Sequence, residues 1–515
     1  MTKTKKAVVI GTGAGGLLAS AYLSKAGFQV EAFEKAPNIG GYLNSFSIKD
    51  YHFDPGIHYI GECSKDRMVN KLLSEIGIDV SNLFCEMDPD GFDLYHFPDL
   101  EVKMCKGIDN YRDRLAKLFP KEVKNIDRFF DIIRKIDKAT KKIFPLSYRS
   151  FQFSDMNLIF DIPAFLPMIL RCGLTDYASF LKWITSDKKL QAVLSANLGC
   201  IGLPPSKIST FLGLTMFHHF INGAFFPKNG GAGLRDSIMK VAESNGAVFR
   251  TKSEVKKIII KNGCVKGVVI KNGDIIEADL IVSAIEPSIT FGQLIEYKDL
   301  PKSLCRKVIN LEPSFGSFYV FLGLKRDLKQ HNMGAFNIWD FYTYDMDEIY
   351  SEAFKGKINE KFSTIASPNS LKENTSTLAP KDCSTLEIIT FVSYEPFSRW
   401  DGLSSNKRGI KYKKFKEEIG ERIIEGFSKN HPGIIGDIEV KNFATPVTNS
   451  FWVNAVKGGA YGPAMSRNQT FLSRFNTKTY IKNLLLAGSG VYGAGIAPCL
   501  FSGFVAAKMA EKNFA

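Results

Sequence analysis

The chain has 515 residues, of which 45% are hydrophobic and 23% charged, so it is too long for one ordinary core and too apolar for a disordered protein. The net charge of +14 is dispersed along the sequence, which argues against a nucleic-acid partner. No run reaches the roughly 18 apolar residues of a membrane-spanning helix, and the nine cysteines form no CxxC pair, which indicates neither a metal site nor a disulfide framework. We therefore expect a globular, cytoplasmic protein with two or three compact units.

The first forty residues predict a strand, a helix and a second strand. A short apolar run at 7–10 is followed at once by Gly11-Thr12-Gly13-Ala14-Gly15-Gly16, which places glycine at all three positions of the GxGxxG motif. An apolar helical stripe over 17–23 ends at Gly27, and a second strand expected over 28–33 leads to Glu34. This order is typical of the first unit of a dinucleotide-binding domain.

Each residue type in this unit has a physical task. Gly11 makes a tight turn, Gly13 lets the backbone approach a pyrophosphate, and Gly16 lets the helix pack closely on the strand. The carboxylate of Glu34 can accept both hydroxyls of an adenosine ribose. The cofactor-binding candidates here are Gly11, Gly13, Ala14, Gly15, Gly16, Glu34 and Lys35.

The next segment carries a resemblance to a known family. A double glycine, Gly40-Gly41, is followed by the run Phe53-Asp54-Pro55-Gly56-Ile57-His58-Tyr59-Ile60-Gly61. The first resembles an FAD motif of the flavoproteins that include amine oxidases, phytoene desaturases and carotenoid isomerases, and the second is similar to retinol saturases. The resemblance implies non-covalently bound FAD, with contacts at Gly40, Gly41, Asp54 and Gly56, and makes His58 a catalytic candidate.

The middle of the chain is expected to return to the FAD domain. Short segments at 246–250, 255–258, 267–270 and 279–284 indicate several strands, and an ordinary β-meander is the alternative interpretation. The family resemblance implies that Val255 places its backbone against the adenine.

The end of the sequence repeats the glycine motif. Residues 484–487 indicate a strand, and Gly488-Ser489-Gly490-Val491-Tyr492-Gly493 again matches GxGxxG before a predicted helix. No second strand with a ribose acid follows, so a second nucleotide site is not expected. The resemblance instead implies flavin contacts, at Gly488, Gly490, Gly493, Ala494, Gly495 and Ile496. Ser489 stands where many relatives carry an acid, and Tyr461, just before this segment, is a second catalytic candidate that can donate a proton or form a wall.

The fold class expected is α/β: a Rossmann-type FAD-binding domain of the amine oxidase and phytoene desaturase kind with an inserted α+β substrate domain. The FAD domain is expected to comprise 1–61, 221–289 and 441–515, and the substrate domain 62–220 and 290–440. An apolar segment near 156–170 is either buried core or a peripheral membrane contact. His218 and His219 are interpreted as structural histidines.

The resemblance implies an FAD-dependent oxidoreductase acting on a carbon–carbon bond of an apolar retinoid, carotenoid or other isoprenoid. Saturation of a double bond is the first hypothesis, and desaturation and cis/trans isomerisation are the alternatives. A non-catalytic flavin- or lipid-binding protein is the alternative of another class. The electron donor or acceptor stays open, with transiently bound NAD(P)H as one candidate, and so does the oligomeric state.

Overall fold

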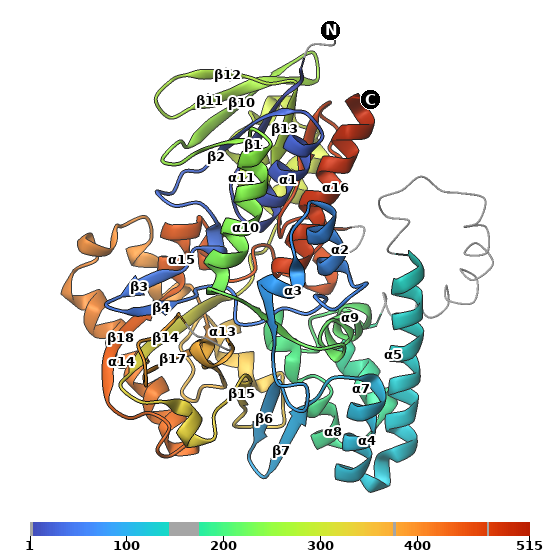
Figure 1. Ribbon diagram of the computed structural model, residues 1–515, viewed down its shortest axis with the longest axis vertical. Coiled ribbons are helices and arrows are strands. Elements are labelled where there is room, and N and C mark those ends of the chain that lie inside the picture. Colours follow the sequence, from blue (N-terminus) through green and yellow to red (C-terminus); the bar gives the residue numbers. More distant parts are fainter. Residues whose placement is uncertain (1–3, 144–174, 374–376, 471–472, 515) are drawn as a thin grey trace.

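The structure is a computed structural model that describes residues 4–143, 175–373, 377–470 and 473–514. Figure 1 shows a parallel sheet with its helices near the two chain termini and, below it, a larger sheet with a group of helices at its side. The predicted membrane-contacting segment, 156–170, lies outside the described residues. Within them, no helix is both long enough and apolar enough to cross a bilayer.

The sheet nearest the termini consists of five parallel strands. Their order is β19-β13-β1-β2-β9, and their bounds are Leu484–Leu486, Leu280–Ser283, Lys6–Ile10, Gln29–Phe33 and Val248–Arg250. Parallel sheets are covered on both faces, so their strands are nearly continuous apolar runs, as in β1, β13 and β19. The predicted Rossmann-type core is confirmed.

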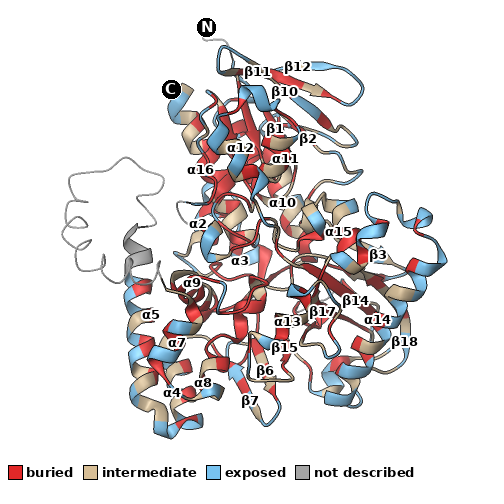
Figure 2. Ribbon diagram, turned by 180° about the vertical axis from the view of Figure 1, so that it is seen from behind, coloured by how far each residue is buried: buried red, intermediate tan, exposed pale blue. Residues whose placement is uncertain are grey.

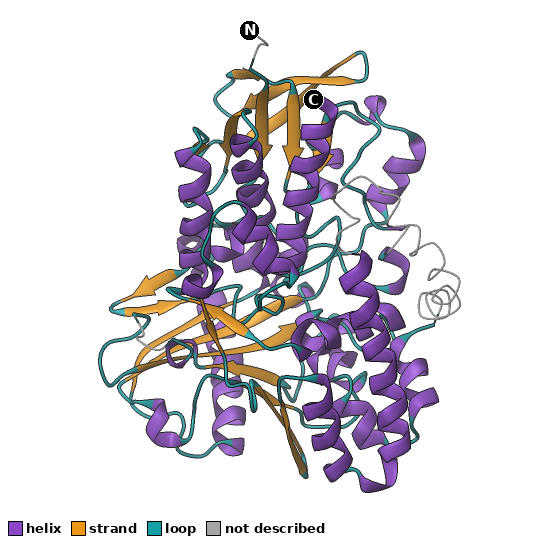
Figure 3. Cartoon of the chain, turned by 45° about the vertical axis from the view of Figure 1, so that its right-hand side comes forward, coloured by secondary structure: helices purple, strands orange, loops and turns teal. Residues whose placement is uncertain are grey.

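Helices cover one face of this sheet (Figure 3). The first helix, α1, is buried along nearly its whole length because α10 and α16 flank it. The packing of α1 on α16 depends on glycine, since a Cβ on Gly503 would lie 2.1 Å from the carbonyl oxygen of Gly15. The helices of this layer are α1 (Ala14–Lys25), α2 (Met68–Glu75), α3 (Val80–Leu83), α10 (Gly230–Ser244) and α16 (Ile496–Phe514).

The opposite face carries an antiparallel three-stranded sheet and two short helices. The meander that the sequence left open is therefore present, and it is attached to the dinucleotide sheet through a shared apolar core. Its elements are β10 (Val255–Lys261), β11 (Cys264–Ile270), β12 (Ile275–Glu277), α11 (Pro287–Gly292) and α12 (Lys302–Ile309).

A seven-stranded sheet dominates the other half of the molecule, in the order β18-β14-β17-β16-β15-β6-β7. Alternate residues of its strands face α14 (Gly409–Asn430) on one side and the interior of the molecule on the other. The strands in this order are Ile438–Ala444, Gly316–Leu324, Ser384–Val392, Thr364–Ser367, Asn337–Asp340, Asp93–Phe97 and Leu100–Met104.

A group of helices packs beside this sheet in one large aromatic-rich core. Figure 2 shows their inward faces as buried and their outward faces as exposed. They are α4 (Ile108–Leu118), α5 (Val123–Ile143), α7 (Tyr177–Ile184), α8 (Lys188–Val193) and α9 (Thr210–Ile221). The remaining elements are the hairpin β3–β4 (Phe46–Ile48, Tyr51–Phe53), the pair β5–β8 (Phe84–Glu86, Phe225–Pro227), α13 (Ser351–Phe354) and α15 (Pro446–Val453).

Three features lie across the predicted domain bounds. Strand β18 crosses residue 440 because it is hydrogen-bonded along β14. Helices α2 and α3 pack in the dinucleotide core, although they belong to the segment assigned to the substrate domain. The hairpin β3–β4 packs on the seven-stranded sheet, where Tyr51 lies over Gly323. The exact division into domains stays a prediction.

Candidate active site

A single continuous cavity of about 770 Å³ runs between the parallel sheet and the seven-stranded sheet. One end is lined by the glycine motifs, and the other by apolar side chains of α9, β15, β16 and β17. The volume is within the range of cofactor and substrate pockets.

The fingerprint glycines have the geometry that their predicted tasks require. Gly11 has φ of +86°, which only glycine adopts without strain. A Cβ on Gly16 would lie 2.0 Å from the carbonyl oxygen of Gly11, so this glycine allows the helix to approach the strand. A Cβ on Gly13 would meet no atom within 4 Å, because Gly13 faces the cavity at the N-terminus of α1. A pyrophosphate fits this open backbone and the positive end of the helix dipole.

Glu34 lies at the end of β2 and lines the same end of the cavity. Its Oε2 accepts hydrogen bonds from the backbone N–H and the hydroxyl of Thr12, at 3.1 and 2.7 Å. Its Oε1 accepts from the backbone N–H of Ala36 at 3.0 Å. These bonds fix the carboxylate beside the fingerprint, as binding of a ribose requires.

Two further glycine segments close the nucleotide end. Gly40 and Gly41 have φ of +123° and +56°, and a Cβ on Gly41 would lie 3.3 Å from the Cα of Gly13. From the C-terminal segment, Gly488, Gly493, Ala494, Gly495 and Ile496 line the cavity, and α16 begins there. Ser489, and not an acidic residue, forms that part of the lining.

Most other cofactor-binding candidates also lie on the cavity: Ala14, Gly15, Lys35, Gly56 and Val255. Lys35 donates a hydrogen bond to Asn454 Oδ1 at 2.6 Å, and burial lowers its pKa. Val255 is the first residue of β10. The assignment of these residues as FAD contacts stays a prediction.

Three candidates do not line the cavity. Gly16 lies behind the fingerprint turn, and a Cβ on Gly490 would lie 2.4 Å from Pro287. Asp54 is buried beneath the cavity wall, where its Oδ1 accepts from the backbone N–H of Gly231 at 2.7 Å and from the Ser45 hydroxyl at 2.5 Å. Asp54 therefore joins its loop to the start of α10, and its assignment as an FAD contact stays a prediction.

The other end of the cavity is apolar and aromatic. Trp339 forms part of its wall, and its indole N–H donates to Asp93 Oδ1 at 2.9 Å. Asp93 is fully buried and also accepts from Tyr59 at 3.0 Å. The apolar lining here comprises Phe211, Leu212, Met216, Phe220, Trp339, Ile365, Ile389, Phe391 and Met465.

His58, a catalytic candidate, lines the cavity between the two ends. Its Nδ1 lies 3.1 Å from Oε2 of Glu387, and neither ring nitrogen has a hydrogen-bond partner in the described part of the chain. Burial is the main cause that lowers the pKa of His58, to about 3, and it raises the pKa of Glu387 to about 8. At neutral pH the proton of this pair therefore resides on the carboxyl group, and the imidazole is neutral.

Lys372 lies next to this pair and is 2% exposed. Its Nζ donates to the backbone carbonyl of His58 at 2.6 Å and to side-chain oxygens of Asn337, Ser367 and Asn369 at 2.6, 2.5 and 3.1 Å. Burial lowers its pKa to about 7, against the opposing charges of Glu387 and the neighbouring aspartates. This ammonium joins the His58 loop to β15 and β16.

Tyr461, the second catalytic candidate, also lines the cavity. Its hydroxyl donates to the carbonyl oxygen of Gly199 at 3.1 Å, and burial raises its pKa well above the usual range. Such a hydroxyl is a poor acid, and the ring is better placed to form a wall.

The two neighbouring histidines of α9 are both engaged in structural contacts. His218 Nε2 lies 2.8 Å from Asp137 Oδ1, and His219 Nε2 accepts from the backbone N–H of Gly61 at 3.1 Å. His219 nevertheless lines the cavity, where burial lowers its pKa to about 4.

Sequence reasoning missed Glu387, Lys372 and Asp93. Glu387 carried a signal, since it is the one charged residue within the apolar strand Ser384–Val392. Lys372 and Asp93 carried none, because only the fold brings them to His58 and Trp339.

Comparison with known proteins agrees with the geometry. The family model "Flavin containing amine oxidoreductase" matches residues 14–509. The all-trans-retinol 13,14-reductase of Danio rerio is 26% identical over 516 residues, covering 96% of this chain and 84% of that protein. The chloroplastic prolycopene isomerase of Daucus carota is 28% identical over 526 residues, covering 97% and 79%.

Among solved structures, an oxidoreductase from Methanosarcina mazei has a TM-score of 0.64 at 18% identity, covering 97% of this chain and 99% of that one. This likeness shows a shared fold. The family match over nearly the whole chain and the glycine-lined end of the cavity (the glycine cradle, from 11–15, 40–41 and 488–495) together identify FAD as the cofactor. The chain therefore belongs to the flavin-containing amine oxidoreductase family.

Proposed function

We propose that this FAD-dependent oxidoreductase reduces one carbon–carbon double bond of an apolar, isoprenoid-like polyene. The observation that carries the proposal is the continuity of the cavity from the glycine cradle into an apolar, aromatic-lined end. An apolar chain that enters this end is removed from water along its length, which provides the binding free energy. The relatives named retinol 13,14-reductases support this class of substrate.

Reduction of a double bond adds a hydride to one carbon and a proton to its neighbour. Bound FAD, once reduced by an external donor such as NAD(P)H, supplies the hydride chemistry. The protein must therefore supply the proton, at a position close to the substrate and shielded from water.

The pair of Glu387 and His58 suits this proton delivery. Glu387 holds a proton at neutral pH because burial raises its pKa to about 8. In the proposed transfer, Nδ1 of the neutral imidazole, 3.1 Å from Oε2, accepts the carboxyl proton once the two groups align. Nε2 then gives up its proton to the substrate carbon. The carboxylate left behind is stabilised by the nearby charge of Lys372. His58 is thus the proposed proton donor, and Tyr461 and Trp339 are proposed as walls.

Desaturation and cis/trans isomerisation are the competing reactions. The 28% identity to a prolycopene isomerase keeps isomerisation as a second candidate. The same pocket could serve either reaction, so the reactions have to be distinguished by the change in the oxidation state of the flavin.

The experiment is anaerobic. The purified protein is reduced with dithionite, and retinol, phytoene and lycopene are added separately while the visible flavin band is followed. Reoxidation together with a product two mass units heavier supports a reductase. Bleaching of the oxidised protein by phytoene would replace the proposal with a desaturase, and a changed double-bond geometry with no net change in the flavin would replace it with an isomerase. A flavin that no polyene oxidises or reduces would favour a non-catalytic binding protein.

A further inference from the structure

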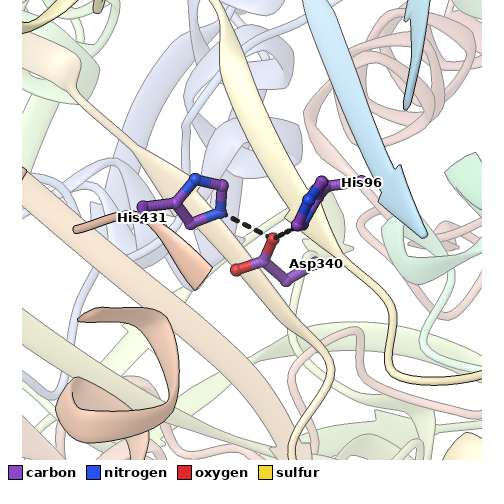
Figure 4. Close-up of side chains that lie close together, drawn as sticks. All are labelled: His96, Asp340 and His431. Atoms are coloured by element: carbon purple, nitrogen blue, oxygen red, sulfur yellow. Dashed lines mark hydrogen bonds and ion pairs between the residues drawn. The ribbon is translucent and has the colours of Figure 1, made fainter. Parts of the chain in front are cut away.

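A second cluster of reactive side chains lies on the seven-stranded sheet, outside the lining of the flavin cavity. His96 is near the end of β6, Asp340 is the last residue of β15, and His431 directly follows α14. Figure 4 shows both imidazole rings directing a nitrogen at the same carboxylate oxygen. His96 Nδ1 lies 3.1 Å and His431 Nε2 lies 2.7 Å from Asp340 Oδ1.

The carboxylate in this cluster is buried, and only one of its two oxygens has hydrogen-bond partners among the described residues. Asp340 is 3% exposed, and its second oxygen, Oδ2, is buried with no hydrogen-bond partner among the described residues. An anionic oxygen in this position is costly unless a cation or a donor satisfies it. The unpartnered oxygen therefore points to a ligand that the cluster itself does not contain.

Two nitrogen donors and one oxygen donor are a set that suits zinc. The three donor atoms lie within 4.8 Å of one another, and tetrahedral zinc with bonds of about 2.0–2.1 Å needs them about 3.3 Å apart. The His96 side chain is 34% exposed, which leaves room for that adjustment and a path for the ion. His431 lies at the C-terminal end of α14, where the helix dipole favours a positive charge. We propose that His96, Asp340 and His431 bind a Zn²⁺ ion, with water in the fourth position.

The position of the site suggests what the ion would do. It would join three segments distant in sequence, since His96 and Asp340 are 244 residues apart and His431 is a further 91 residues along. Trp339, the residue before Asp340, lines the flavin cavity, and successive side chains of a strand point to opposite faces. Zinc bound to Asp340 would therefore hold β15 on the face opposite to the cavity, while Trp339 of the same strand lines the apolar end.

The test measures zinc directly on the FAD-loaded full chain. The protein is stripped with EDTA, titrated with zinc chloride against a chromophoric chelator, and desalted for elemental analysis. We expect one zinc per chain, an affinity at least 10-fold lower in Asp340→Asn and His431→Gln, and a melting temperature that zinc raises in the unaltered protein but not in those variants. His331→Gln, which removes a histidine outside the cluster, should bind zinc as the unaltered chain does.

Each outcome decides the proposal. Absence of stoichiometric zinc would overturn it, and so would zinc binding that the cluster variants retain, because another site, such as cysteines, would then hold the ion. If Asp340→Asn fails to fold, His96→Gln replaces a more exposed ligand, and its flavin spectrum reports whether the fold is intact. Loss of zinc binding in His96→Gln with an unchanged flavin spectrum supports the site, and retained binding overturns it.

Discussion

The two ends of the cavity bind by different means. The nucleotide end is formed by backbone, with glycines from 11–15, 40–41 and 488–495 and the N-termini of α1 and α16. The apolar end is formed by side chains, mainly large apolar ones from α9 and from β15 to β17. Backbone geometry suits a ligand of fixed shape and charge, whereas a wall of side chains can be changed one residue at a time. The cofactor can thus be retained while the substrate changes.

Removing the ammonium at the junction of the two ends should have the largest effect. Lys372→Met leaves the His58 carbonyl and three side-chain oxygens without their donor. We expect the free energy of unfolding to fall by about 3–5 kcal/mol, as for one partner removed from a buried charge network. Urea unfolding of the FAD-loaded protein measures it. Lys361→Met, at an exposed position, should change stability by less than about 0.5 kcal/mol. An equal loss in the free energy of unfolding for the two changes would show that Lys372 does not hold the His58 loop to β15 and β16.

Glu387→Gln tests the carboxyl group that supplies His58 with its proton. Glutamine keeps the acceptor oxygen for the backbone N–H of Asp54 but has no acidic proton. The rate at which a polyene reoxidises the flavin should fall about 100-fold, while the flavin spectrum stays unchanged. Glu418→Gln, on the exposed face of α14, is the matched control.

The same pair predicts a pH profile. Donation requires the protonated carboxyl group, and its pKa is raised to about 8 by burial. The reoxidation rate of the unaltered enzyme should therefore fall above about pH 8. The alkaline fall should be absent in Glu387→Gln; if it persists, another group supplies the proton.

Gly13→Val tests the nucleotide end alone. The Cβ of the added side chain would meet no protein atom within 4 Å and would enter the space where the pyrophosphate is expected. FAD affinity should fall by about 10- to 100-fold, the equivalent of 1–3 kcal/mol of steric conflict, as measured by flavin fluorescence titration. Gly426→Val adds the same atoms to open space on α14 and should leave the affinity unchanged. Full flavin occupancy in Gly13→Val would contradict the assignment.

Leu212→Trp tests the apolar end alone and should have the smallest effect. The larger ring would shorten the space for a polyene, and we expect KM to rise about 10-fold with no change in FAD content. Leu118→Trp, at an exposed position of α4, serves as the control. A loss of flavin in Leu212→Trp would show that the two ends are not separable.

The nucleotide end could be predicted because its requirements are local. Gly11, Gly13 and Gly16 occupy one turn, and Glu34 follows within one strand–helix–strand unit, so the spacing itself carries the information. Asp54 was placed in a loop that lines the cavity, but the motif did not reveal that its carboxylate accepts a hydrogen bond from the start of α10. The apolar end, the Glu387–His58 pair and the His96–Asp340–His431 cluster depend on pairings across a sheet. The paired residues are far apart in sequence, so no local spacing of residues indicates them.

The order of strands in the parallel sheet also constrains how the protein matures. Strand β1, made first, has β13 as a neighbour only after residue 280, and α16 packs on α1 only once residues 496–514 exist. The ribosome must therefore reach residue 514 before the FAD-binding end of the cavity can close. Until then the apolar faces of β1 and α1 lack part of their cover, and we expect free FAD to promote the last steps of folding.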